Sequence, residues 1–417
     1  MQRTPQPRIY RARRGGEKLR QSAGIAAGLV AVLVVAWIAV ALLRSPPAPR
    51  LSLTIPTTSM ISGAPLALRP SFGAQEAVAI DGIGTIAVSG EETPAPIASL
   101  TKMMSALVVL RDHPLSRGES GPTITITGAD VATYGLEAAQ GDSVVKVQAG
   151  EQLSELQALE GALIPSGDNI IQLLATWDAR STSAFVGRMN ARARTLGMDH
   201  THYTGPSGVD PTTVSTAADQ LRLAETAMAN PVFAGIVSMA QVSLPVAGVQ
   251  YNVDADLGSD GIDGIKTGWV PQGGGCFVFA AKDAFHGTEV SVLGAVIGEQ
   301  GATPIPTALS VAKQLVVTAE RTLHVFRLAR GTTVGTLSAP YASSVRVVTT
   351  SSVSLIGWSG VHVRFSSRTI RSLPDAASTG SRIGSLATRL GEVRRTTALM
   401  TAAALRGPSL AWRLAHP

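Results

Sequence analysis

Residues 97–104 read Ile97-Ala98-Ser99-Leu100-Thr101-Lys102-Met103-Met104, and an apolar run, Ser105 to Leu110, follows them. The apolar pattern predicts a buried helix, and two prolines just before it place Ser99 at or near the helix start. Residues three apart lie on one helix face, so we expect the Ser99 hydroxyl beside the Lys102 amine. A neutral lysine can take the proton of a serine hydroxyl, so this pair predicts a nucleophile and its base. Because a serine three residues before a lysine is common by chance, the prediction needs support from elsewhere in the chain.

Two later motifs supply that support. Residues 163–169, Leu-Ile-Pro-Ser-Gly-Asp-Asn, predict a tight turn before an apolar helix and present a second hydroxyl, that of Ser166. Residues 263–269, Asp-Gly-Ile-Lys-Thr-Gly-Trp, predict a strand that presents a cation, a hydroxyl and a glycine that lets a ligand approach the backbone. A serine–lysine pair, a second serine and a Lys-Thr-Gly strand, in that order, are the signature of penicillin-recognising acyl-transfer enzymes.

The segment from about residue 65 to 300 resembles a known family, the low-molecular-mass D-alanyl-D-alanine carboxypeptidases, the serine peptidases among the penicillin-binding proteins. Between the motifs, further short runs are similar to the family's pattern: Met189-Asn190, Leu196-Gly197-Met198, Gly205-Pro206-Ser207-Gly208 and Ser215-Thr216-Ala217-Ala218-Asp219. The resemblance implies an α+β fold, namely a penicillin-binding/β-lactamase-like transpeptidase domain with an antiparallel sheet and a helical subdomain. Family members often carry a small β-rich domain after the catalytic one.

The resemblance also implies a role for each motif residue. Ser99 would attack the penultimate D-Ala carbonyl of a peptidoglycan stem peptide ending in D-Ala-D-Ala, Lys102 would take its proton, and Ser166 would relay a proton to the leaving amine. The oxyanion hole would consist of the N–H groups of Ser99 and Trp269. β-Lactams are the expected inhibitors, and neither a metal nor an organic cofactor is implied. The predicted substrate-binding residues, of which the first two would receive the terminal carboxylate, are Lys266, Thr267, Gly268, Trp269, Asp168 and Asn169.

The second motif departs from the family's pattern. The family has Ser-x-Asn followed by an acid, whereas this chain has Ser166-Gly167-Asp168-Asn169, with the acid and the amide exchanged. An amide can donate to a substrate carbonyl, but an ionised carboxylate can only accept. Two arrangements stay open: Asp168 pairs with Lys102 or Lys266, or a small shift of the turn brings Asn169 to the site.

The N-terminus predicts a membrane anchor. Residues 1–22 carry seven basic and one acidic side chains, and residues 23–43 carry no charge, enough for a helix to cross ~30 Å of hydrocarbon. The positive-inside rule places the tail in the cytoplasm, so we predict a single-pass bacterial membrane protein with an extracytoplasmic catalytic domain. A cleaved signal peptide is the alternative. The predicted parts are a cytoplasmic tail (1–22), a transmembrane helix (23–43), a linker (44–60), the catalytic domain (61–300) and a small β-rich domain (301–417).

The net charge of +6 lies at the two ends of the chain. Residues 23–300 carry 14 basic and 25 acidic side chains, whereas residues 301–417 carry 14 basic and three acidic ones. This division, with no aromatic-interleaved basic stripe, argues against a nucleic-acid partner. The basic C-terminal segment either holds the catalytic domain over anionic lipid or wall polymer, or is a solvated face. The single cysteine, Cys276, excludes an internal disulfide and is expected as a small buried strand residue.

Short β-branched runs at 344–350 and 361–365 predict strands in the C-terminal segment. We expect a helix from Thr396 to Leu405 and a final strand from Leu410 to Leu414.

Two other functions compete with the carboxypeptidase. A β-lactamase shares the three motifs, but the similar serine types use an added glutamate to activate water, and no Glu-x-x-x-Asn occurs between residues 185 and 215. A cell-wall-binding protein with a weakened site is the other alternative, and the exchanged Asp168 motivates it. The membrane helix and the C-terminal domain favour a carboxypeptidase acting in peptidoglycan biosynthesis and cell shape.

Overall fold

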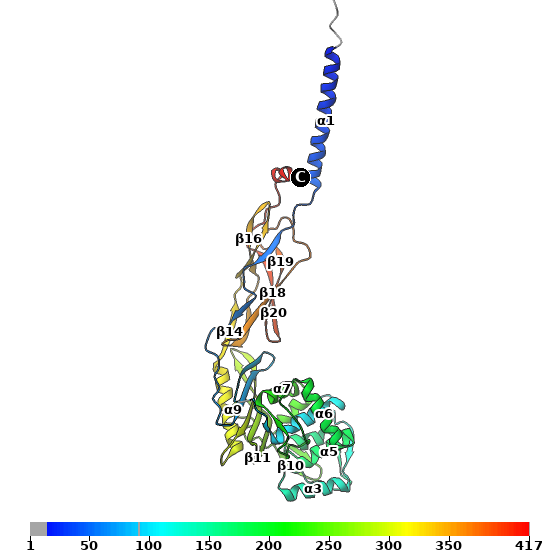
Figure 1. Ribbon diagram of the computed structural model, residues 1–417, viewed down its shortest axis with the longest axis vertical. Coiled ribbons are helices and arrows are strands. Elements are labelled where there is room, and N and C mark those ends of the chain that lie inside the picture. The colour runs from blue at the N-terminus through cyan, green and yellow to red at the C-terminus, as the bar shows by residue number, and fades with distance from the viewer. Residues whose placement is uncertain (1–14, 91, 417) are drawn as a thin grey trace, which may run out of the picture.

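Three regions follow one another along the long axis of the molecule (Figure 1). The computed structural model describes residues 15–90 and 92–416, so most of the predicted tail lies outside the described residues. A long helix, α1 (Gly15–Leu43), occupies one end, and its part from Arg20 to Leu43 is long and apolar enough to cross a membrane. A β-rich region lies in the middle, and the region that carries the three motifs lies at the far end.

The far region is built on a five-stranded antiparallel sheet with the order β11-β12-β13-β3-β4. The Lys-Thr-Gly motif lies on β11, which is an edge strand and pairs only with β12 in this sheet. The strands are β3 (Gln75–Ile80), β4 (Gly84–Ser89), β11 (Ile262–Val270), β12 (Gly274–Phe285) and β13 (Thr288–Glu299).

Strand β12 shows why this sheet is buried on both faces. Successive side chains point to opposite faces of a strand, and here both sets are apolar. Cys276 and Val278 join the core on the side of the helical region, whereas Phe277 and Phe279 join a second core on the other side. The thiol of Cys276 is buried, as expected, because it fills a core position.

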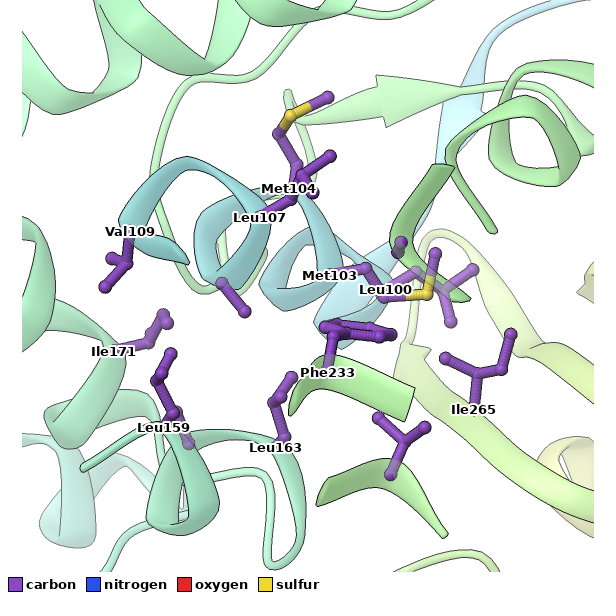
Figure 2. Packing of buried hydrophobic residues seen from close by; sticks show 14 of the residues in the cluster. Leu100, Met103, Met104, Leu107, Val109, Leu159, Leu163, Ile171, Phe233 and Ile265 are labelled. Carbon is purple, nitrogen blue, oxygen red and sulfur yellow. The ribbon is translucent and has the colours of Figure 1, made fainter. Parts of the chain in front are cut away.

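Helix α2 (Thr101–Asp112) runs through the centre of the helical region, and each of its residues from Thr101 to Leu110 is buried. Figure 2 shows its apolar side chains packed against helices that come from later in the chain and against β11. Helix α4 begins at a capping box, in which Ser154 and Gln157 satisfy each other's backbone N–H groups. The other helices are α3 (Gly128–Gln140), α4 (Glu155–Leu163), α5 (Asp168–Ala179), α6 (Thr182–Thr195), α7 (Ala217–Met228) and α8 (Pro231–Val237).

Three small strand pairs complete the helical region. They are β5 (Ala95–Pro96) with β8 (Val214–Ser215), β6 (Thr123–Thr125) with β7 (Gln152–Ser154), and β9 (Gln241–Leu244) with β10 (Gly248–Tyr251).

Helix α9 (Pro304–Arg321) covers the outer face of the five-stranded sheet. Its buried residues, such as Leu309 and Val316, pack with Phe277 and Phe279 of β12. The C-terminal domain predicted from the sequence begins at residue 301 and includes this stretch, but the structure packs it on the five-stranded sheet. The reason is its apolar face, which covers sheet surface that would otherwise be exposed.

The middle region is a seven-stranded antiparallel sheet with the order β1-β15-β16-β20-β19-β18-β2, accompanied by the pair β14–β17. Val334, Leu337, Ile383 and Leu399 are among its fully buried core residues. Its strands are β1 (Arg50–Leu53), β2 (Thr58–Met60), β14 (Leu323–Leu328), β15 (Thr333–Ala339), β16 (Ala342–Thr349), β17 (Val353–Trp358), β18 (His362–Thr369), β19 (Arg382–Leu390) and β20 (Val393–Thr401).

The stretch expected as a linker contributes both edge strands of this sheet. Strand β1 pairs with β15, with Arg50 opposite Ser338, and β2 pairs with β18, with Met60 opposite His362. Such short strands carry too little periodicity to be recognised, and their partners come from the other end of the chain. The chain therefore leaves α1 and enters the middle region directly.

Two C-terminal expectations are wrong. Residues expected as a helix from Thr396 lie in β20, which pairs with β19 along its length, so tertiary pairing overrides local helix propensity. The expected strand from Leu410 is helix α10 (Leu410–Ala415), which begins at a Ser409 side-chain cap.

Candidate active site

Ser99 lies in a tight turn that leads into α2. A 3-10 turn, η1 (Ala98–Leu100), precedes the helix, and Ala98 has φ +50° in the left-handed region. The hydroxyl of Thr101 donates to the Ala98 carbonyl at 2.7 Å and fixes the turn. Ser99 is partly exposed, whereas Leu100 and Thr101 are buried. The turn thus presents the hydroxyl at the protein surface from a rigid base.

The Lys102 amine lies beside that hydroxyl and is completely buried. Its Nζ is 2.8 Å from Ser99 Oγ, 2.5 Å from Asp168 Oδ1 and 3.2 Å from the Ser207 carbonyl oxygen. The charged amine donates to Ser99, Asp168 and Ser207. After losing one proton it can still donate to Asp168 and Ser207 while its lone pair accepts from the Ser99 hydroxyl. This arrangement allows Lys102 to act as the base for Ser99.

Ser166 lies at the turn between α4 and α5. Its φ of +65° is in the left-handed region, and Gly167 is so closely packed that a Cβ would come within 2.7 Å of the Gly161 carbonyl oxygen. The side chain of Ser166 is buried, and its Oγ has no hydrogen-bond partner among the described residues. A buried hydroxyl without a hydrogen-bond partner costs free energy. Such an unpaired hydroxyl is expected where a ligand supplies the missing partner.

The structure distinguishes the two exchanged residues. Asp168 accepts from Lys102 through Oδ1 and from the Ser143 N–H through Oδ2, at 3.1 Å. Asn169 makes two hydrogen bonds with the backbone of Val145, one to its carbonyl at 2.8 Å and one from its N–H at 2.9 Å. Asp168 therefore lies in the site, whereas the amide of Asn169 holds the start of α5 against the segment of Val145.

Strand β11 lies directly against the turn that carries Ser99. A Cβ at Gly268 would be 3.0 Å from the Ser99 backbone nitrogen and 3.1 Å from the Ile97 carbonyl oxygen, so only glycine lets the strand approach this closely. Lys266 and Thr267 are buried just before it, and Trp269 is 49 % exposed just after it. Motifs that lie far apart in the sequence thus form one site.

Burial controls the charge of Lys266. Its Nζ donates to the Thr267 carbonyl at 3.2 Å, and no carboxylate among the described residues lies within ion-pair distance. Burial, and then the Lys102 amine, lower the pKa of Lys266 to about 7. Both causes disfavour the charged form of the Lys266 amine, so the carboxylate of a substrate would stabilise that form.

Sequence reasoning did not single out two groups near Lys102. The Ser207 carbonyl acts through its backbone, which no side-chain motif reveals. Glu137, on α3, is half-buried, and burial together with Asp168 and Asp142 raises its pKa to about 7. Its position depends on how α3 packs against α5, so the sequence carries no signal for it. No cluster of three His, Cys, Asp or Glu side chains suited to a metal occurs in the described part of the chain.

A serine beside a buried lysine, a second serine and a cationic edge strand, set between an antiparallel sheet and a helical region, define a penicillin-recognising serine hydrolase. The family model for D-alanyl-D-alanine carboxypeptidases matches residues 65–299. The chain belongs to this family of serine-type carboxypeptidases, and the resemblance predicted from the three motifs is confirmed. Neither the β-lactamase nor the weakened wall-binding protein is favoured by the comparisons.

Curated relatives agree with this assignment. The chain is 33% identical over 215 residues to the D-alanyl-D-alanine carboxypeptidase DacB2 of Mycobacterium tuberculosis, a match that covers 50% of this chain and 69% of that protein. It is 28% identical over 204 residues to DacA of Escherichia coli, where the match covers 48% of this chain and 49% of that protein.

Solved structures show the same fold. The Streptomyces K15 DD-transpeptidase has a TM-score of 0.53 and 26% identity, covering 60% of this chain and 98% of that one. The D-alanyl-D-alanine carboxypeptidase DacD from Francisella tularensis has a TM-score of 0.57 and 20% identity, covering 84% of this chain and 96% of that one. The predicted α+β fold is therefore confirmed.

Proposed function

We propose that this chain removes the terminal D-alanine from peptidoglycan stem peptides ending in D-Ala-D-Ala, through an acyl-enzyme on Ser99. The observation that carries the proposal is that Ser99, Lys102 and the strand of Lys266 meet at one place. The Lys102 Nζ lies 2.8 Å from Ser99 Oγ, and Gly268 of the same strand packs against the Ser99 backbone. Separate sequence motifs meet at one point, as acyl transfer to a serine requires.

Acylation would begin with Ser99 and Lys102. The uncharged Lys102 amine takes the hydroxyl proton while the Ser99 oxygen attacks the penultimate D-Ala carbonyl. The N–H groups of Ser99 and Trp269 stabilise the oxyanion, each donor contributing roughly 3 kcal/mol. Ser166, whose hydroxyl has unused bonding capacity, relays to the leaving D-alanine amine the proton that Lys102 took from Ser99. Water then attacks the acyl-enzyme and releases the shortened peptide.

Recognition of the substrate's end would fall to β11. A substrate carboxylate beside Lys266 and Thr267 accepts charge-assisted hydrogen bonds from them. It is also the negatively charged partner that the Lys266 amine does not have within the protein. This requirement explains selection for a free C-terminus, and the carboxylate of β-lactams meets it as well. A peptide ending in an amide brings no such charge, so we expect it to bind far more weakly.

Asp168 would replace the amide donor of the family's motif with an acceptor. Its two oxygens bind Lys102 and the Ser143 N–H, whereas an asparagine could accept at only one of these positions. We therefore assign Asp168 to orienting Lys102 rather than to holding a substrate carbonyl. The substrate's own carbonyl would depend more on backbone donors of β11.

We further propose that α1 anchors the enzyme with its catalytic region outside the membrane. Arg413 of α10 donates to the carbonyls of Leu42 and Arg44 at the C-terminal end of α1, each at 3.2 Å. A cation at this end of a helix satisfies free carbonyls and favours the helix dipole. Mass spectrometry of the mature protein tests the anchor, since an N-terminus beyond residue 40 would exclude it.

The enzymatic proposal is tested by incubating the full-length protein, in detergent, with a D-Ala-D-Ala stem peptide and measuring free D-alanine. Release of one D-alanine per peptide, and labelling by a fluorescent penicillin that is lost in Ser99→Ala, are expected. The same peptide with a C-terminal amide is the control and should release little. Rapid nitrocefin turnover with no D-alanine release would instead indicate a β-lactamase, and an unlabelled wild type would indicate a binding protein.

A further inference from the structure

Lys266 belongs to a group of buried charges that extends beyond the three motifs. The group consists of Lys102, Asp168, Lys266 and Asp254, and the other three charges all act on Lys266. Their exposed fractions are 0%, 3%, 1% and 5%. The first two form a direct ion pair, but the last two do not lie within ion-pair distance of any opposite charge in the part of the chain that the structure describes. Asp254 lies outside all three sequence motifs.

The backbone holds Asp254 between the second motif and β11. The N–H of Val253 donates to the carbonyl of Ile164, two residues before Ser166, at 3.2 Å. The Asn252 amide donates to the Val237 carbonyl at 3.3 Å. That same carbonyl lies against Gly264, two residues before Lys266, where a Cβ would be only 2.7 Å away. The loop carrying Asp254 is therefore fixed to both walls of the site.

The Asp254 carboxylate has unused bonding capacity. Its Oδ1 accepts from the Asp256 N–H at 3.0 Å, but its Oδ2 is buried and has no partner among the described residues. The charged groups facing Asp254 are Asp256, Lys266 and Lys313, and those facing Lys266 are Lys102, Asp168 and Asp254. A buried carboxylate without full solvation persists when an opposite charge nearby offsets its cost.

We propose that Asp254 is a positioning residue that helps to keep the Lys266 amine charged for the carboxyl end of the substrate. The inference rests on the proposed function, because that function gives Lys266 its ligand. Asp254 itself touches neither the substrate nor the reacting atoms. Asp168 also favours the charged form of Lys266, but its two oxygens are bound to Lys102 and to the Ser143 N–H, whereas Asp254 has an oxygen without a partner among the described residues.

The electrostatics give the direction of the effect. Burial, and then Lys102, lower the pKa of Lys266 to about 7, whereas Asp168, and then Asp254, oppose that decrease. Burial raises the pKa of Asp254 to about 6, so this carboxyl is largely ionised at neutral pH. Loss of the Asp254 charge would let Lys266 lose its proton at a lower pH. Substrate affinity would then fall at a lower pH, because only the charged amine attracts a carboxylate.

Asp254→Asn tests the proposal by the pH dependence of KM. For an N-acylated peptide ending in D-Ala-D-Ala, we expect KM to rise about tenfold near pH 7.5 and the increase to begin about one pH unit lower than in the wild type, since one unit of pKa corresponds to tenfold. We expect kcat to change much less. Asp260→Asn, in the same loop but 61% exposed as a side chain, is the matched control and should leave both constants unchanged.

A double variant separates this role from a structural one. If Asp254 acts through Lys266, then Asp254→Asn adds nothing to the KM of a Lys266→Met protein. An Asp254→Asn profile that superimposes on the wild type, or an equal increase of KM in the Lys266→Met background, would overturn the proposal. A variant that merely misfolds would lower kcat and the melting temperature without moving the pH profile.

A measurement without substrate distinguishes this inference from the proposed function. The difference in melting temperature between the wild type and the Lys266→Met protein begins to change at the pH where Lys266 loses its proton in the folded state. In the Asp254→Asn background, we expect that change to begin at a lower pH. If the wild type releases no D-alanine, the proposed function fails, whereas an unmoved onset contradicts the role of Asp254 whatever the activity.

Discussion

Two buried lysines in one site have opposite surroundings. Lys102, at the start of α2, has three acceptors for its amine, one of them a carboxylate at 2.5 Å. Lys266, on the edge strand, has one carbonyl at 3.2 Å. The protein itself therefore satisfies the first amine, whereas the second has bonding capacity left for a ligand. Substitution of Lys102 and of Lys266 should therefore have different consequences for stability and for substrate binding.

Lys102→Met should have the largest effect. Loss of the base is expected to slow acylation by penicillin about 10²- to 10⁴-fold. The free energy of unfolding should also fall by about 3–5 kcal/mol, because Asp168 is left as a buried charge without its partner. Stopped-flow acylation and thermal melting measure the two effects. Ser99→Ala is the control: it also abolishes acylation but keeps the ion pair and should melt like the wild type.

Lys266→Met should separate binding from stability. KM for a D-Ala-D-Ala peptide is expected to rise about 10- to 100-fold, the value of a hydrogen bond to a charged group. The melting temperature should stay the same or rise, because the substitution removes a buried cation with no carboxylate at ion-pair distance. A loss of stability as large as that of Lys102→Met would show that the two lysines are equivalent after all.

The pH dependence of the wild type should report Lys266. The pKa of this amine is lowered to about 7 from its ordinary 10.5, so KM should rise as the pH increases through about 7, while kcat stays flatter because a bound carboxylate keeps the amine charged. The unfolded chain binds this proton more tightly than the folded one. Between about pH 7 and 10.5 the group therefore makes stability rise with pH, relative to Lys266→Met. A KM that is constant from about pH 6 to 9 would contradict this assignment.

The smallest effect on activity should come from Asn169→Ala. Its amide holds both polar groups of the buried Val145 backbone, so the free energy of unfolding should fall by about 1–3 kcal/mol. Acylation of the folded fraction should change only a few-fold. Denaturant unfolding followed by penicillin labelling checks both. A severe loss of labelling at unchanged stability would return Asn169 to the site.

The sequence alone determined the chemistry of the site and the helix that carries the nucleophile. Ser99 and Lys102 are three residues apart, so helical geometry by itself brings their side chains together, and the three motifs and their order were readable without a structure. The apolar run of α1 could likewise be recognised from consecutive residues alone. Each of these signals depends on neighbouring residues only, because a helix repeats within a few positions.

The surroundings of those groups follow from long-range contacts in the folded chain. The tertiary structure paired Asp168 with Lys102 rather than Lys266, and directed Asn169 to Val145. It placed β1 and β2 in a sheet formed mostly by the end of the chain, and it fixed the loop of Asp254 against Ile164 and Val237. Such pairings join residues far apart in sequence. Their free energy depends on burial and on neighbouring charges, neither of which a short motif contains.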